Sequence, residues 1–229
     1  MDVRDTILTF EDVSIAAQGH QMTGVTSVSF GLAAGDTVLI TVEEGRERLP
    51  LPDAAEGLLA PDTGKVRFGG ESWAGMGPHQ QTDRRGTIRR VFADYGWISN
   101  LDVLENVCLA ECHHTRRHEA EIVAEARGLA RRFGMADIPE GRPSRIHSQM
   151  LRKLEWVRAL LGSPRLIILE RPLFGAPKAD APLFVQSVCE AAEKGAAVLW
   201  LTDEPRVWEC DRFKSVQRFR MDGDKLCAA

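Results

Sequence analysis

Two short, fully apolar runs near the C-terminal end of the chain constrain the fold most. Residues 166–169 and 197–202 each have strand length, and a helix predicted over 182–194 ends at Gly195 between them. Strands that are apolar at every position are typical of a parallel sheet covered on both faces. The run 37–42 has the same character. The sequence therefore predicts an α/β core.

The N-terminal third and the middle of the chain follow different periods. Residues 7–10, 25–30 and 65–68 are β-rich and separated by glycines, which favours an antiparallel sheet. From about residue 100 the pattern is helical, with helices expected over 116–133 and 147–161. A helical block is therefore expected to interrupt the α/β core.

Length and composition bound the remaining choices. The 229 residues allow one large domain or two small ones, and no run approaches the ~20 apolar residues of a membrane span. The first thirty residues lack a signal pattern, so we expect the chain in the cytosol. A net charge of −4 argues against a non-specific nucleic-acid binder, so no nucleic-acid partner is expected. Four arginine pairs are predicted to lie on solvated helix and loop surfaces: 84–85, 89–90, 116–117 and 131–132.

The cysteines indicate reduced thiols. There are five, and no two have Cys-x-x-Cys spacing, so a disulfide framework is not expected. Cys108 and Cys112, with nearby histidines at 113, 114 and 118, could be considered as metal ligands. Because the two i, i+4 pairs point in different directions on one helix, they would not converge tetrahedrally, and no metal site is expected.

The order of several landmarks resembles that of a known family, the nucleotide-binding subunits of ABC transporters. The segments that carry the resemblance are 57–64, 91–92, 101–107 and 158–169. Residues 150–153 and 114–115 are more similar to the Mla-type phospholipid-transport ATPases than to other branches. The resemblance runs in register over nearly the whole chain.

The resemblance implies a P-loop NTPase fold of the ABC type. That fold has a RecA-like mixed sheet, an N-terminal antiparallel β region and a helical insert. We therefore expect one ABC ATPase-like domain over 1–229, with an α/β core of about 1–96 and 151–229 and an insert of about 97–150.

The segment at the family's phosphate loop departs from the consensus G-x-x-x-x-G-K-[ST]. That loop needs glycines so that backbone N–H groups surround the phosphates, a lysine, and a hydroxyl that binds magnesium. Here Gly45 remains, but Val42 and Glu47 stand at the outer glycine positions, Arg48 at the lysine and Leu49 at the hydroxyl. Glutamates at 43, 44 and 47 add negative charge, and each contact with a phosphate at ~4 Å would cost about 4 kcal/mol at an effective dielectric near 20.

The other positions that serve ATP in the family are also changed. The Walker B strand ends at Glu170 followed by Arg171, so a carboxylate is kept while the general base becomes a cation. The changed positions are Ala17 for the adenine-stacking aromatic, Ala93 for the Q-loop glutamine, 146–150 for the signature, Pro177 for the D-loop aspartate and Asp203 for the switch histidine. The resemblance therefore implies an ABC fold that has lost ATP chemistry, without catalytic residues and without a bound cofactor.

A chemically silent subunit is expected to act through partners. The leading hypothesis is a non-hydrolysing scaffold or regulatory subunit of a transport complex, with lipid as one cargo class. Its partner would be an ABC permease or an intact ABC ATPase subunit, as a homo- or heterodimer, and it would reach the inner membrane only peripherally, through that partner. Docking is expected at the groove near Tyr95 and Trp97, although core packing of Trp97 is an equal alternative.

Two rival functions stay open at this point. In one, the chain is an unusual ATPase in which Glu170 holds magnesium and Arg48 holds phosphate. In the other, Arg48 and Arg171 draw a different anionic ligand into the old cleft. The favoured alternative is that these arginines form salt bridges with Glu47, Glu170 or Asp203 and fill the cleft. The geometry of residues 42–50, either an open nest or a collapsed loop, would discriminate between them.

Overall fold

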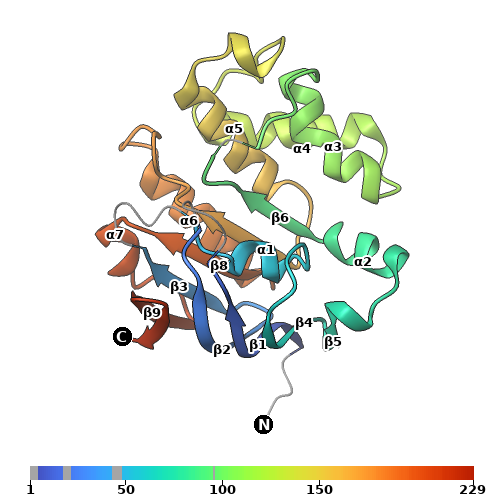
Figure 1. Cartoon of the computed structure of the whole chain (residues 1–229). Coiled ribbons are helices and arrows are strands. Elements are labelled where there is room, and N and C mark those ends of the chain that lie inside the picture. Colours follow the sequence, from blue (N-terminus) through green and yellow to red (C-terminus); the bar gives the residue numbers. More distant parts are fainter. Residues whose placement is uncertain (1–4, 18–21, 43–47, 95) are drawn as a thin grey trace.

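The computed structural model describes residues 5–17, 22–42, 48–94 and 96–229 and contains one large mixed sheet (Figure 1). Its ten strands are β1 (Thr6–Ile15), β2 (Val25–Ala33), β3 (Thr37–Thr41), β4 (Thr63–Phe68), β5 (Glu71–Ser72), β6 (Ile88–Val91), β7 (Leu166–Glu170), β8 (Ala197–Thr202), β9 (Val216–Asp222) and β10 (Lys225–Ala228). They lie in the order β5-β4-β1-β2-β10-β9-β3-β8-β7-β6.

The sheet has a parallel part and an antiparallel part, as the sequence predicts. Strand β3 is parallel to β8 and to β9, and β7 is parallel to β8 and to β6. Strand β1 pairs antiparallel with both β2 and β4. The predictions of a parallel core and of an N-terminal antiparallel sheet are therefore confirmed.

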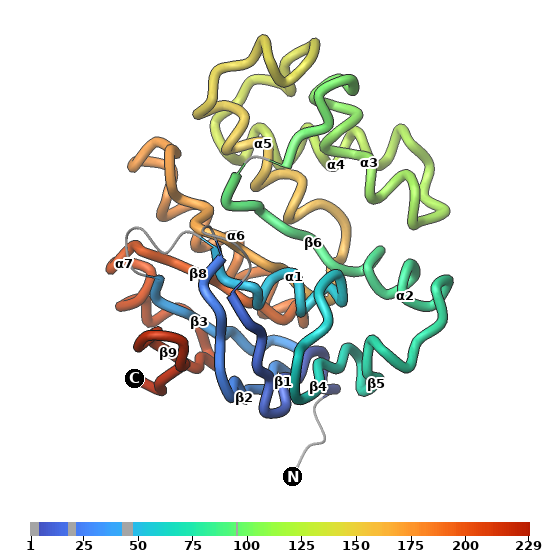
Figure 2. Tube along the Cα trace, viewed as in Figure 1, coloured from blue at the N-terminus to red at the C-terminus, as the bar shows by residue number. Residues whose placement is uncertain are grey.

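The helices lie both around β6 and, on the left of the picture, beside β8 and β9 (Figure 1). They are α1 (Leu51–Ala55), α2 (Pro78–Arg85), α3 (Val103–His114), α4 (Glu119–Arg132), α5 (Ser148–Leu160), α6 (Ala181–Glu193) and α7 (Pro205–Trp208). Helix α3 begins with a capping box, in which Glu105 accepts a hydrogen bond of 2.6 Å from the backbone N–H of Asp102. In the tube view, α3, α4 and α5 form the upper part of the molecule (Figure 2).

The central strands bury both of their faces. In β3, Leu39 packs into an apolar cluster with α3 to α6, whereas its neighbours Val38 and Ile40 pack into a second cluster with β1, β2 and α1. Ile167 and Ile168 of β7 divide in the same way. Because alternate residues of a strand point to opposite faces, this division explains why the runs are apolar at every position.

One sequence-based prediction is wrong at β6. Arg89 and Arg90 were expected on a solvated surface, but they lie in this strand and are only 5% and 6% exposed. Tertiary pairing decides their place, since each guanidinium finds carboxylates inside the molecule. The short helices α1, α2 and α7 and the strands β9 and β10 were also not predicted.

In the described part of the chain, no helix is both long enough and apolar enough to cross a membrane.

Candidate functional site

The segment at the phosphate-loop position leaves strand β3 and enters helix α1. Gly45 and the glutamates at 43, 44 and 47 lie outside the described residues, so the geometry expected to discriminate between an open and a collapsed loop stays a prediction. Arg48 is exposed, while Leu49 is 2% exposed and belongs to the apolar cluster beneath β1 and β2. Leu49 therefore serves packing and offers no metal ligand.

The first turn of helix α1 offers few backbone N–H donors to an anion. A helix that follows a phosphate loop normally presents free backbone N–H groups at its first turn. Here the N-cap is Pro50 and Pro52 follows at the second helical position, and proline has no N–H. Asp53 adds an acidic side chain to the same turn. The start of α1 is therefore short of donors and negatively charged.

Glu170, at the position of the family's metal-binding carboxylate, is held by an arginine that the sequence did not single out. The Nε of Arg90 lies 2.6 Å from Oε1 of Glu170. The same guanidinium donates through Nη1 to Asp53 at 2.7 Å and to Glu56 at 2.6 Å. The side chains of Arg90 and Glu170 are only 4% and 5% exposed. We call Arg90, Asp53, Glu56 and Glu170 the Arg90 cluster.

In the Arg90 cluster, burial and the neighbouring charges shift the pKa values in opposite directions. Burial raises the pKa of Glu170 and of Glu56, and Arg90 offsets part of that rise in both. Burial alone would lower the pKa of Arg90, but Glu170 and Glu56 outweigh it and raise that pKa. Arg90 therefore stays charged and acts as the internal cation for these carboxylates. The charge of Arg48 also reaches Glu170, as the weakest of the effects on its pKa.

A second ion pair joins the positions of the general base and of the switch histidine. Arg171 Nη2 and Nε lie 2.7 and 2.9 Å from Oδ2 of Asp203. The backbone of Arg171 has a φ of +43°, a strained value for a side-chain-bearing residue, and its guanidinium also lies over the ring of Phe174 at 4.6 Å. The expected pairing of Arg171 with Asp203 is therefore present, whereas Glu170 pairs with Arg90 instead.

The segment at the signature position forms an ordinary helix start. His147 is the N-cap of α5, and its Nδ1 accepts a hydrogen bond of 3.3 Å from the backbone N–H of Gln149. The N-cap side chain thus uses a donor that an open helix end would present to a ligand.

A groove lies between β6, the segment after it and helix α3. Its volume is about 510 Å³, and Ile98 and Leu109, each 42% exposed, line it together with Phe92 and Arg158. Trp97 is partly buried and packs against the apolar core, with Arg158 4.9 Å from its ring centre. Tyr95 lies outside the described residues. The groove expected near Trp97 exists, but Ile98 and Leu109 supply its exposed apolar surface.

Among the described residues, no three histidine, cysteine, aspartate or glutamate side chains are placed to hold a metal ion. Cys108 is buried while Cys112 is exposed, so the two thiols face different surroundings. The Arg90 cluster was missed by sequence reasoning. Two arginines between Ile88 and Val91, directly before Phe92, were the available signal for a charged pair inside a strand.

Comparisons with known proteins agree with this architecture. No protein-family model matches the chain. A lipoprotein-releasing system ATP-binding protein of Cereibacter sphaeroides is 27% identical over 154 residues, which are 66% of this chain and 68% of that protein. A bicarbonate transport ATP-binding protein of Synechocystis is 29% identical over 74% of this chain and 58% of that protein, and a thiamine import ATP-binding protein of Cereibacter sphaeroides is 27% identical over 75% and 72%.

Solved structures match over almost the whole chain. A dimeric bacterial ABC transporter cassette superposes with a TM-score of 0.82 at 16% identity and covers 96% of both chains. The ATP-binding subunit of another ABC transporter matches with a TM-score of 0.78 at 20% identity, covering 96% of this chain and 88% of that one. The chain has the fold of an ABC ATPase nucleotide-binding domain, and its relatives support placing it with the ATP-binding subunits of ABC transporters.

Proposed function

We propose that this chain is a non-hydrolysing scaffold or regulatory subunit of an ABC transport complex. The observation that carries the proposal is the pairing of Glu170 with Arg90 at 2.6 Å inside the Arg90 cluster. A magnesium ion at Glu170 would have to displace a buried guanidinium that three carboxylates hold. Losing such a partner leaves charges buried and unpaired, which is strongly destabilising.

The rest of the old cleft supports the same function. Hydrolysis needs a general base beside the attacking water, but Arg171 at that position is a cation bound to Asp203. The start of α1 lacks N–H groups at two prolines. Because the base and the phosphate donors are changed as well as the metal position, one substitution would not restore hydrolysis.

The groove lined by Ile98 and Leu109 supports a role through partners. We infer that a permease or an intact ATPase subunit docks there, and that contact with a membrane is made through that partner. Exposed apolar side chains around a central hollow suit an interface anchor. A division into an α/β core and an insert of about 97–150 belongs to this proposal.

The cargo class of the complex is part of the proposal. The resemblance of residues 150–153 to phospholipid-transport ATPases favours a lipid, and one relative is named for a lipoprotein-releasing system. Other relatives are named for bicarbonate and thiamine transport. Lipid therefore stands as the first cargo class to test.

The test is nucleotide binding by the purified chain, measured by equilibrium dialysis with ATP and magnesium. We expect no saturable binding in the wild type. The matched variants are Glu170→Gln and Arg90→Met, which remove the two partners separately. ATP hydrolysis that Glu170→Gln abolishes would overturn the proposal. A second assay, affinity capture of the chain from a membrane extract, should recover a permease or ATPase subunit, and Leu109→Asp should lose it.

One rival function has an observation in its favour. The similar proteins are named as ATP-binding proteins, so an ATPase with unusual motifs is the second candidate. It would use Arg48 for phosphate and Glu170 for magnesium, and the dialysis experiment discriminates between the two. Repurposing of the cleft for another anion gains less support, because Asp203 already neutralises Arg171.

A further inference from the structure

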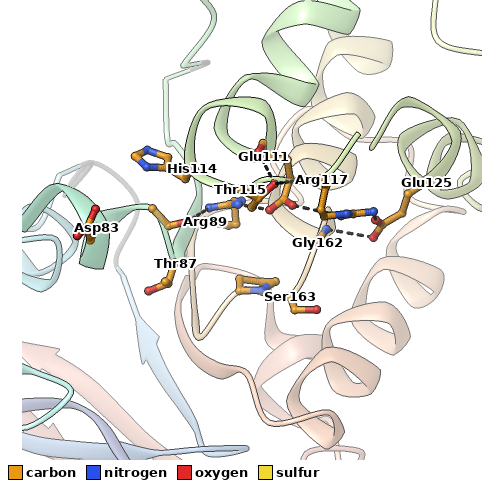
Figure 3. A pocket seen from close by; sticks show the side chains of 12 residues that line it. Asp83, Thr87, Arg89, Glu111, His114, Thr115, Arg117, Glu125, Gly162 and Ser163 are labelled. Atoms are coloured by element: carbon orange, nitrogen blue, oxygen red, sulfur yellow. Dashed lines mark hydrogen bonds and ion pairs between the residues drawn. The ribbon is translucent and has the colours of Figure 1, made fainter. Parts of the chain in front are cut away.

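The helical part α3–α4 meets the α/β core at a chain of alternating charges. Arg89 of β6 donates to Oε1 of Glu111 in α3, and Arg117 lies 3.2 Å from the other oxygen of Glu111. Arg117 also lies 2.6 Å from Glu125 of α4. We call Arg89, Glu111, Arg117 and Glu125 the junction chain, and Figure 3 shows its members in a row beside a cavity of about 560 Å³.

The junction chain closes on the segment that returns to the core. Glu125 accepts a hydrogen bond of 3.0 Å from the backbone N–H of Gly162, which follows α5 and precedes β7. Glu111 also lies directly against this glycine, since a Cβ added to Gly162 would come within 2.2 Å of its Oε1. The junction chain therefore connects β6, from which the backbone leaves the core, with helices α3 and α4 and with the loop at Gly162 that returns to the core.

Burial makes these contacts costly to break. The side chains of Arg89 and Glu111 are 5% and 4% exposed, so separating them would leave two charges without water. Arg117 and Glu125 are about one third exposed and extend the chain toward solvent. An insert that rotated on the core would have to break the Arg89–Glu111 pair first.

A second charged group holds the outgoing segment from helix α5. Glu155 has a fully buried side chain and lies 2.7 Å from Arg152 Nη1. Arg152 donates to the backbone carbonyls of Phe92 and Ala93, and Arg158 donates to that of Gly96 at 2.6 Å. The backbone directly after β6 is therefore tied to α5 at three carbonyls.

Apolar packing is continuous across the same junction. Val103 and Val107 of α3 and Ile122 of α4 belong to one cluster with Val198 and Trp200 of β8. The insert helices and one face of the sheet therefore share a single core.

We propose that the insert is fixed to the α/β core as one rigid body, with the junction chain as the charged tie across the junction and with the Arg152–Glu155–Arg158 group holding the core segment that leads into the insert. This inference goes beyond the proposed function, because a subunit could fail to bind ATP and still hinge freely. A fixed insert would present the groove at Ile98 and Leu109 in one shape.

Pulsed electron–electron double resonance, which measures the distance between spin labels on two native cysteines, tests the proposal. Cys112 of α3 and Cys227 of β10 are exposed, Cys108 and Cys189 are buried, and Cys210→Ser removes the intermediate thiol. With spin labels at 112 and 227, we expect a single narrow distance distribution. In Glu111→Gln, which keeps the shape and removes the charge, the distribution should widen at least twofold or gain a second peak.

Two further variants keep the result interpretable. Glu125→Gln acts at the exposed end of the junction chain and should widen the distribution less, so it decides the matter if Glu111→Gln does not fold. Glu11→Gln breaks an exposed pair with Arg67 inside the core and should leave the distribution narrow. A broad wild-type distribution, an unchanged width in both junction variants, or equal widening in Glu11→Gln would each overturn the proposal.

Failure of this inference and failure of the proposed function are distinguishable. Saturable binding of ATP with an unchanged, narrow distribution overturns the function and keeps the rigid junction. A broad distribution without ATP binding overturns the rigid junction and keeps the function.

Discussion

Arg90 Nε lies 2.6 Å from Oε1 of Glu170, and this pair ties β6, the last strand at one edge of the sheet, to the end of β7. The two strands are parallel neighbours, with Arg90 opposite Ile168, so the guanidinium reaches along the sheet edge to the carboxylate two residues further on. Asp53 of α1 and Glu56, the C-cap of that helix, approach the same guanidinium. The carboxylate at the position that the resemblance assigns to a metal ligand is thus paired with a side chain of the protein itself.

Removing this cation should destabilise the protein strongly. We expect Arg90→Met to lower the free energy of unfolding by about 3–5 kcal/mol at pH 8, because it leaves buried carboxylates unpaired. Urea unfolding measures the effect. The control Arg67→Met removes the exposed pair with Glu11 and should cost about 0–1 kcal/mol.

The cost of Arg90→Met should also depend on pH. Burial raises the pKa of Glu170 and of Glu56, whereas the charge of Arg90 lowers both. Without Arg90, both pKa values should therefore rise further. The carboxylates are then protonated in the folded state at mildly acidic pH, where an unpaired site costs less. The loss of stability should therefore be smaller at pH 5 than at pH 8. An equal loss at both values would show that the carboxylates do not sense Arg90.

Glu155 should give the wild type a pH-dependent stability. Burial raises the pKa of Glu155 from its ordinary value of 4.5 to about 7, despite the opposing charges of Arg152 and Arg158 beside it. Between these values the folded state keeps a proton that the unfolded chain has released, so stability is present at low pH and is lost as pH rises through about 7. The free energy of unfolding should fall over this window by on the order of 3 kcal/mol.

Glu155→Gln isolates this contribution. The variant cannot titrate at position 155. The free energy of unfolding of the wild type should therefore fall relative to that of the variant as pH rises from 5 to 8. Urea titrations at several pH values measure it, and Glu140→Gln, an exposed loop substitution, should run parallel to the wild type. Parallel curves for Glu155→Gln as well would contradict the raised pKa.

The sequence predicts the sheet well because apolar runs report burial directly. The runs at 166–169 and 197–202 lie in β7 and β8, and the capping pair at Asp102 and Glu105 marks the start of α3. Prediction fails at β6, where two adjacent arginines suggest solvent. Their burial depends on carboxylates 22 and 80 residues away in the chain, and local pattern carries no record of such partners.

The candidate site could be predicted from the sequence only as a set of changed motif positions. Changed motif positions at Arg171 and Asp203 indicate missing chemistry, and their mutual ion pair is foreseeable because opposite charges replace the former groups. Helix α1 contributes Asp53 and its C-cap contributes Glu56 to the Arg90 cluster, but a five-residue helix that contains Pro52 and follows Pro50 gives too weak a periodic signal to be revealed by the sequence. The Arg90 cluster therefore becomes visible only in the three-dimensional structure.

Two glycines should respond to alanine in opposite directions. Gly162 has a φ of +77°, and an added Cβ would come within 2.2 Å of Glu111, so Gly162→Ala should destabilise the protein by about 2 kcal/mol or more. Gly128 lies on the exposed side of α4 with open space at its Cα, so Gly128→Ala should stabilise it by about 0.5–1 kcal/mol. Thermal unfolding of both variants checks the pair, and a neutral Gly162→Ala would mean that Glu111 does not press on the returning loop.

The cysteines should separate into two reactivity classes in the native protein. Burial raises the pKa of Cys108 to about 12 and that of Cys189 to about 11, so both stay protonated as well as inaccessible at pH 8. Cys227 and Cys112 are exposed and should react, with Cys112 the slower of the two because desolvation and nearby glutamates raise its pKa. Iodoacetamide labelling followed by peptide mass spectrometry gives the order, and denaturant should make all five thiols reactive. Modification of Cys108 as fast as Cys227 in the native protein would contradict the packing of α3 against the sheet, and with it the shared apolar core on which the rigid junction depends.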